Sequence, residues 1–88
     1  MFSLSDKIQY YKSRFGLWDG NKRNYARGFV NGSSVNHTRW HYVEDKKELT
    51  YLYDELKRAK TPEDRENLIE SISYTKGCLA GYSAKMKS

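Results

Sequence analysis

The chain has 88 residues, of which 38% are hydrophobic, and carries a net charge of +5 at pH 7. This size predicts a single compact domain over residues 1–88 and disfavours an enzyme with a deep enclosed pocket. The single cysteine, Cys78, excludes an internal disulfide and a Cys-rich zinc site, and no apolar stretch approaches the length of a membrane span.

The first two predicted elements are helices. Apolar side chains line one side of residues 6–15, and Gly16 is well placed to end that helix. Asp19 can cap a second helix over residues 20–32. An alternative stays open there, because Asn31-Gly32 is also a dipeptide that favours the turn of a β-hairpin.

An extended segment is predicted to follow. Residues 33–43 are rich in Thr, Trp, Tyr and Val and have no evident strand partner. We therefore expect an exposed loop with a functional role over these residues.

Two further helices are predicted in the second half of the chain. Asp45 and Glu48 have the spacing of a capping box and precede an amphipathic helix over residues 46–59. Thr61, followed at once by a proline and two acidic residues, is a start signal for a helix over residues 62–85. The short link makes these two helices antiparallel neighbours. The expected fold is all-α, a small bundle of about four helices.

Two of the predicted helices share a short repeat, Tyr-x-Arg/Lys-Gly-x-x-x-Gly. On a helix the tyrosine and both glycines fall along one stripe, which lets another surface approach the backbone closely. That surface is the other stripe of the same chain, a second copy in a homodimer, or a ligand. The helix-packing or dimer residues are Tyr25, Gly28, Gly32, Tyr74, Gly77 and Gly81.

Helices with this repeat, such as Asn24-Tyr25-Ala26-Arg27-Gly28-Phe29-Val30-Asn31-Gly32, resemble those in short proteins encoded by bacteriophages and other mobile elements. The resemblance covers two pieces of the chain. It implies a non-enzymatic binder in the cytoplasm of a bacterial host, which alters host transcription, replication or defence, as inhibitors of CRISPR nucleases do. No active-site residue is implied.

The positive charge lies in one half of the sequence. Residues 1–43 hold seven basic and two acidic side chains, whereas residues 44–88 hold nine of each. A protein that mimics DNA is excluded, because such a protein is acidic. A basic half attracts phosphate or an acidic protein face.

The sequence contains no complete catalytic or metal-binding motif. His37 and His41 are four residues apart but lack a third ligand, so no metal site and no cofactor are predicted. Cys78 falls in the middle of a helix, where it is expected to act as a small hydrophobic side chain. A nuclease-like toxin that uses either histidine is the third functional class considered.

Binding patterns are clearer, and no small-molecule substrate is expected. If residues 20–32 are helical, one face of that helix, away from Tyr25 and Phe29, carries Arg23, Asn24, Arg27 and Asn31. Arginine can contact phosphate or guanine, asparagine can read adenine, and an aromatic loop can stack on a base or fill a protein pocket. The main hypothesis is a protein that occludes nucleic acid or a host nucleoprotein complex. The alternative is an inhibitor that binds a host protein only. The predicted contact residues are Lys22, Arg23, Asn24, Arg27, Asn31, Arg39, Trp40 and Tyr42.

Overall fold

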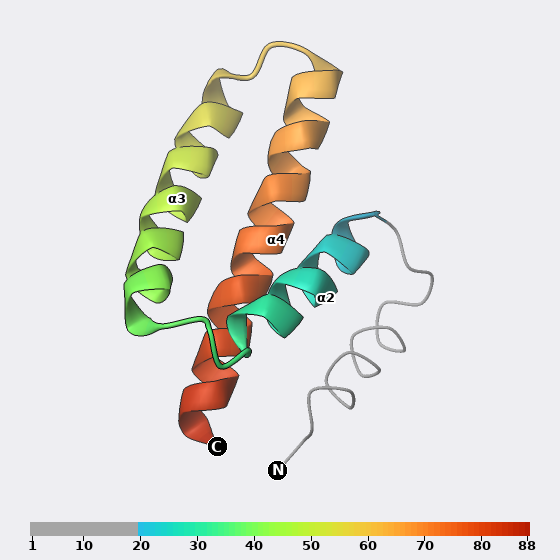
Figure 1. Ribbon diagram of the computed structural model, residues 1–88. Helices are drawn as coiled ribbons and strands as arrows, with labels where there is room; N and C mark the ends of the chain where they lie inside the picture. The colour runs from blue at the N-terminus through green and yellow to red at the C-terminus, as the bar shows by residue number, and fades with distance from the viewer. Residues whose placement is uncertain (1–19) are drawn as a thin grey trace.

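The computed structural model describes residues 20–88, which form three helices and contain no strand (Figure 1). They are α2 over Gly20–Gly32, α3 over Arg39–Arg58 and α4 over Pro62–Lys87. The all-α fold class is therefore confirmed for this part of the chain. The predicted helix over residues 6–15 lies outside the described residues.

The second predicted helix has the expected bounds, since α2 spans residues 20–32. The alternative of a β-hairpin turn at Asn31-Gly32 is wrong, because both residues belong to the last turn of α2. The helix ends just afterwards, where the Ser33 amide still donates to the Phe29 carbonyl at 3.1 Å.

The third helix begins earlier than predicted, at Arg39 and not at residue 46. Its N-cap is Thr38, whose backbone is extended and whose amide donates to Nδ1 of His41 at 3.1 Å. His41 thus takes the place that Glu or Gln has in a capping box. The extended prediction for residues 33–43 is wrong beyond residue 38, because this cap outweighs the weak strand preference of Trp, Tyr and Val.

The predicted capping box at Asp45 and Glu48 is also wrong, since both residues lie inside α3. The helix ends at Arg58, one residue before the predicted end, with Lys57 and Arg58 in its last turn. Cationic side chains in the last turn interact favourably with the negative end of the helix dipole and stabilise the helix.

The fourth helix starts as predicted. The Thr61 hydroxyl accepts a hydrogen bond from the Asp64 amide at 3.1 Å, and Pro62 stands at the first helical position. Two acidic residues, Glu63 and Asp64, complement the positive end of the dipole. The helix continues to Lys87, two residues beyond the predicted end.

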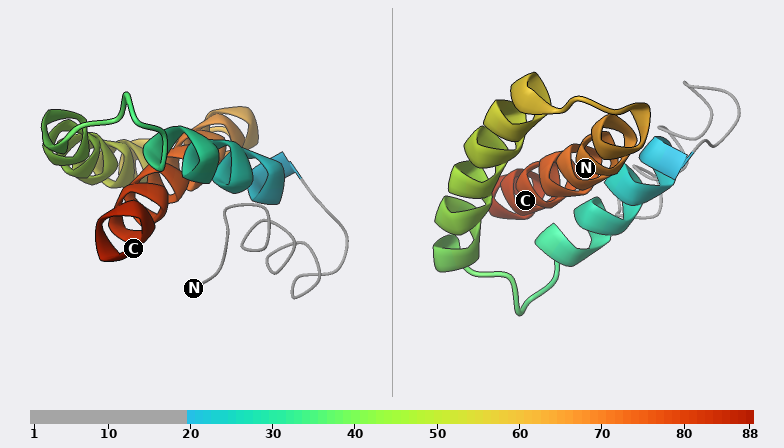
Figure 2. Two further views of the ribbon diagram at one scale, coloured as in Figure 1. Left: turned by 60° about the horizontal axis from the view of Figure 1, so that its bottom comes forward. Right: turned by 90° about the horizontal axis from the view of Figure 1, so that it is seen from above.

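Helix α4 lies at the centre of the arrangement (Figures 1 and 2). Helices α3 and α4 form the predicted antiparallel hairpin, and α2 packs along the C-terminal half of α4. Contacts between α2 and α3 are sparse, so α4 connects the two. The buried side chains come from all three helices. They are Ala26, Phe29, Leu52, Ile72, Thr75 and Cys78.

The glycine stripes of α2 and α4 lie against each other. A Cβ atom on Gly28 would collide with the Tyr74 carbonyl oxygen and stand 2.9 Å from the Cys78 nitrogen. A Cβ atom on Gly77 would collide with the Tyr25 carbonyl oxygen and stand 2.9 Å from the Phe29 nitrogen. Each glycine therefore meets the equivalent backbone atoms of the other repeat, so the contact has approximate two-fold symmetry.

The second glycine of each stripe repeats this relation. A side chain on Gly32 would collide with the Cys78 carbonyl group, and one on Gly81 would collide with the Phe29 carbonyl group. The two helix backbones are thus in direct contact over two turns. This contact within one chain accounts for the Gly-x-x-x-Gly spacing in both helices.

Candidate functional site

The solvent face of α2 carries two of the predicted contact residues. Arg23 and Arg27 are exposed, and they lie one helical turn apart on the same side of the helix. The glycine stripe occupies another side, so packing against α4 leaves these guanidinium groups free to reach a target.

The segment that carries these arginines has only basic charges. Residues 20–43 contain no Asp or Glu but hold four basic side chains. Within the described part of the chain, no ion pair involves Arg23, Arg27 or Arg39. The charges of these three arginines are therefore not offset by an ion pair with any other described residue.

The other predicted residues of α2 have different surroundings. Lys22 and Asn24 are half-buried, and Asn24 lines an acidic hollow between the helices. Asn31 is exposed, but its side-chain amide donates to the Tyr74 hydroxyl of α4. The predicted face of two arginines and two asparagines is therefore divided, since the two arginines are exposed, whereas Asn24 is half-buried and Asn31 bonds to α4.

The start of α3 carries two more predicted residues. Arg39 and Trp40 are exposed in its first turn, and the Trp40 side chain is 67% accessible. The indole packs edge-on against His41 of the same helix, with ring centroids 5.1 Å apart. These two side chains are thus held on a helix and not on a loop.

Tyr42, the last predicted contact residue, is half-buried. Its ring stacks on Tyr82 of α4 with a centroid distance of 4.9 Å and an interplanar angle of 27°. Lys46 Nζ lies 5.1 Å from the Tyr42 centroid. The tyrosine therefore contributes to the contact between α3 and α4.

The two histidines belong to a cluster that joins the α2–α3 connection to the helices. His37 Nε2 lies 2.8 Å from the Asp45 carboxylate, and the rings of His37 and His41 are 4.9 Å apart. Lys85 Nζ donates to the carbonyl oxygens of Ser34 and His37, at 2.8 and 2.5 Å. These contacts hold residues 33–38 against the C-terminal end of α4.

An open hollow of about 490 Å³ lies between α2, α3 and α4. Three carboxylates line it, and one of them, Asp45, pairs with His37. This face is acidic, in contrast to the exposed side of α2. The lining residues are Asn24, Asp45, Glu48, Leu52, Glu70, Ser71, Tyr74 and Thr75.

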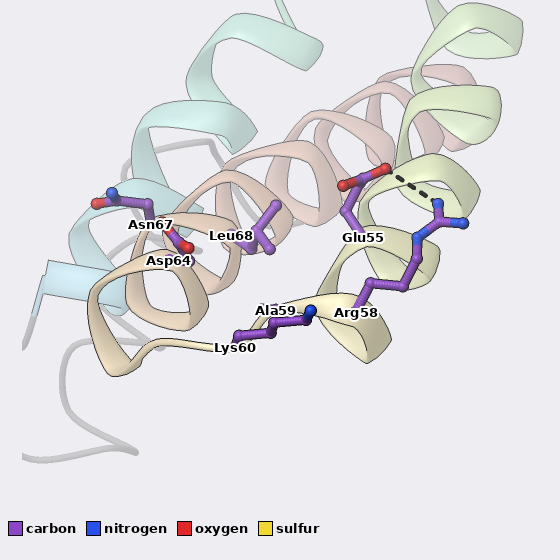
Figure 3. Close-up of a pocket in the computed structure, with 7 residues that line it drawn as sticks. All are labelled: Glu55, Arg58, Ala59, Lys60, Asp64, Asn67 and Leu68. Carbon is purple, nitrogen blue, oxygen red and sulfur yellow. Dashed lines mark hydrogen bonds and ion pairs between the residues drawn. The ribbon is translucent and has the colours of Figure 1, made fainter.

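A second open hollow, of about 460 Å³, lies at the α3–α4 turn (Figure 3). On α3, Glu55 accepts from Arg58 at 3.0 Å, and Leu68 points from α4 into the space between the helices. Charges of both signs line this hollow, so it offers no concentrated charge for an ionic ligand. Its lining residues are Glu55, Arg58, Ala59, Lys60, Asp64, Asn67 and Leu68.

The described residues contain no group of three His, Cys, Asp or Glu side chains placed to hold a metal ion. None of α2, α3 and α4 combines the length and hydropathy that a membrane span requires. Comparison of the chain with protein-family models, curated proteins and solved structures yields no match.

Sequence reasoning missed the partners of the histidine cluster and the exposed face of α3 that carries Trp40 and Tyr51. The spacing of Thr38 and His41, which are N-cap and third residue of a helix, was the signal for the earlier start of α3, whereas no local pattern indicated the partners of His37. A start at residue 39 places Trp40 and Tyr51 on one continuous helix. Both are exposed, at 67% and 57%.

Proposed function

We propose that this protein is a small basic binding protein that acts by occluding nucleic acid or a nucleoprotein complex, without catalytic turnover. The observation that carries the proposal is the exposed face of α2, where Arg23 and Arg27 project from a segment with no acidic residue. Phosphate groups are the chemical partners best suited to such a face.

The geometry of the guanidinium group supports this choice. Arginine donates two parallel hydrogen bonds to a phosphate, and neutralising each phosphate releases bound counterions. Arg39, the first residue of α3, is also exposed and adds a third positive charge that forms no ion pair with another described residue. Together these groups favour binding that depends on charge more than on base sequence.

A bacteriophage or mobile-element origin remains part of the proposal, and rests on the resemblance of the Tyr-x-Arg/Lys-Gly-x-x-x-Gly repeat alone. In this reading the protein acts in the bacterial cytoplasm on host regulation or defence, for example on a CRISPR nuclease. The glycines of the repeat lie in the contact between α2 and α4 and are not available to a target. The binding function therefore rests on the arginines and not on the repeat.

The test compares two variants that lose the same charge. Arg23→Gln/Arg27→Gln removes the α2 face, and Lys57→Gln/Lys60→Gln removes two exposed cations near the α3–α4 turn. Affinity for labelled duplex and single-stranded DNA and RNA is measured from about 50 to 200 mM salt. The arginine variant should bind at least about tenfold more weakly and lower the salt slope by roughly 2.

The lysine variant should keep most of the affinity, and both variants should keep the circular dichroism of the parent. Equal losses in the two variants would show that only net charge matters. Unchanged binding of the arginine variant, or no binding by the parent even at low salt, would refute the α2 face as the site.

An inhibitor that binds only a host protein is the second candidate. Val35, in the α2–α3 connection, is 91% exposed and lies four residues before Arg39. An exposed apolar side chain suits a protein surface better than a phosphate backbone. Salt response separates the two candidates, since an apolar interface loses little affinity between the two salt concentrations.

A further inference from the structure

Helix α3 has a second face that no other described element covers. Four residues, Trp40, Glu44, Lys47 and Tyr51, follow one another at offsets of four, three and four. These offsets bring residues to the same side of an α-helix. We name this set the outer stripe of α3.

The outer stripe faces away from the core contact of its helix. Leu52 is buried on the side toward α4, whereas Trp40 and Tyr51 are 67% and 57% exposed. Among the described residues, Glu44 and Lys47 pair only with each other, at 3.4 Å, and their side chains are 46% and 70% exposed. Two large aromatic rings thus stand about 16 Å apart in solvent with a charge pair between them.

The side chains of the outer stripe are arranged so that the stripe is complementary to an antiparallel copy of itself. Read forward, it is aromatic, acid, base, aromatic; read backward, acid and base exchange places. When two such helices meet in antiparallel orientation, Trp40 of one copy lies opposite Tyr51 of the other. Glu44 of each copy then lies opposite Lys47 of the other. A two-fold interface requires this reciprocity, in which each contact occurs twice.

Other arrangements fit the outer stripe less well. A parallel pair would place Glu44 opposite Glu44 and Lys47 opposite Lys47, which is repulsive. A nucleic-acid backbone finds no net positive charge on the stripe, because Glu44 and Lys47 in its centre carry opposite charges. The charge pattern therefore favours a second copy of this chain.

We infer that two copies of the protein associate through the outer stripe of α3 in antiparallel orientation. Two aromatic pairs and two ion pairs form across the two-fold axis. This inference goes beyond the proposed function, because the stripe does not include the arginines of α2. Association would bring two basic faces into one particle.

Charge reversal gives a direct test on the full chain. A single Glu44→Lys or Lys47→Glu substitution converts both ion pairs of the dimer into like-charge contacts. The double variant Glu44→Lys/Lys47→Glu restores opposite charges in both. A mixture of the two single variants places two lysines of one copy opposite two glutamates of the other, so it should form a mixed dimer.

Sedimentation equilibrium from about 10 to 500 µM covers the affinity range of a small interface. The parent should dimerise, each single variant should associate at least about tenfold more weakly, and the double variant should recover. Lys57→Glu, a reversal outside the outer stripe, should leave association unchanged, and circular dichroism should show all variants folded.

A parent that stays monomeric throughout this range would overturn the inference. The same holds if single reversals have no effect, or if the double variant and the mixture fail to recover. Trp40→Ala supplies an independent readout, since loss of both aromatic pairs should weaken the dimer without changing charge.

Discussion

Cys78 is the residue whose surroundings most alter its chemistry. Its side chain is buried, and its backbone lies against Gly28 and Gly32 of α2. Burial, followed by the negative charge of Asp45, raises the pKa of the thiol from 9.0 to about 11, despite a hydrogen bond with Tyr74 that lowers it. The neutral thiol is therefore the form that the fold stabilises.

This shift predicts a loss of stability at alkaline pH. Between pH 9 and about 11 the thiol ionises in the unfolded chain but stays protonated in the folded one. The unfolded state then binds fewer protons, so the free energy of unfolding falls as pH rises, by up to about 2 to 3 kcal/mol. Urea unfolding of the parent and of Cys78→Ala at several pH values measures this effect.

The Cys78→Ala variant is the control, because it keeps the tyrosines and lysines that also titrate in this range. Its stability should fall less steeply than that of the parent. Parallel curves for the two proteins would contradict the assignment. At pH 8 the thiol should also react with Ellman's reagent slowly in the folded protein and quickly in urea.

At the level of elements, the contact between α2 and α4 is the tightest in the described structure. A glycine inside a helix lowers its stability by about 1 kcal/mol relative to alanine, so its use here needs a reason. The reason is that each glycine meets a backbone carbonyl group of the opposite helix. A backbone atom cannot rotate away as a side chain can.

We predict that Gly28→Ala and Gly77→Ala each destabilise the protein, although alanine favours an isolated helix. The added methyl group must push the two backbones apart, at a cost of about 2 to 3 kcal/mol. Ser71→Ala, an exposed change on α4, should alter stability by less than about 0.5 kcal/mol. Chemical unfolding of the three variants provides the measurement, and glycine variants as stable as the parent would show that the helices do not touch here.

At the scale of the whole molecule, Lys85 connects the end of the chain to its middle. Its ammonium group donates to the carbonyl oxygens of Ser34 and His37 and lies 4.9 Å from the Tyr82 ring centroid. The connection between α2 and α3 is thereby tied to α4. This contact matters because α2 and α3 make few contacts with each other.

Lys85→Met should release that connection. Methionine keeps the length and apolar packing of the side chain but loses both hydrogen bonds, at a cost of about 1 to 3 kcal/mol. The His37 amide, which donates to Ser34 at 3.2 Å, should exchange its hydrogen at least about tenfold faster. Lys87→Met, an exposed change with the same loss of charge, is the control. Equal exchange in both variants would mean that Lys85 does not hold the connection.

The sequence by itself determined the helical class, the bounds of α2 and the start of α4. These features depend on neighbouring residues: the Thr61-Pro62 start signal and the periodic apolar positions act within one or two turns. The face that carries Arg23 and Arg27 was predicted for the same reason, since residues four apart share a side of any helix.

Only the tertiary structure decided which surfaces meet. The glycine repeat fitted a contact within the chain, between copies or with a ligand, and the packing of α2 on α4 selects the first. The start of α3 combines a local cap, Thr38 with His41, and the stacking of Tyr42 on Tyr82, forty residues away, and only the second of these needed the tertiary structure. Such long-range burial outweighs the local preference of β-branched and aromatic residues for extended backbone, which is weak and depends on context.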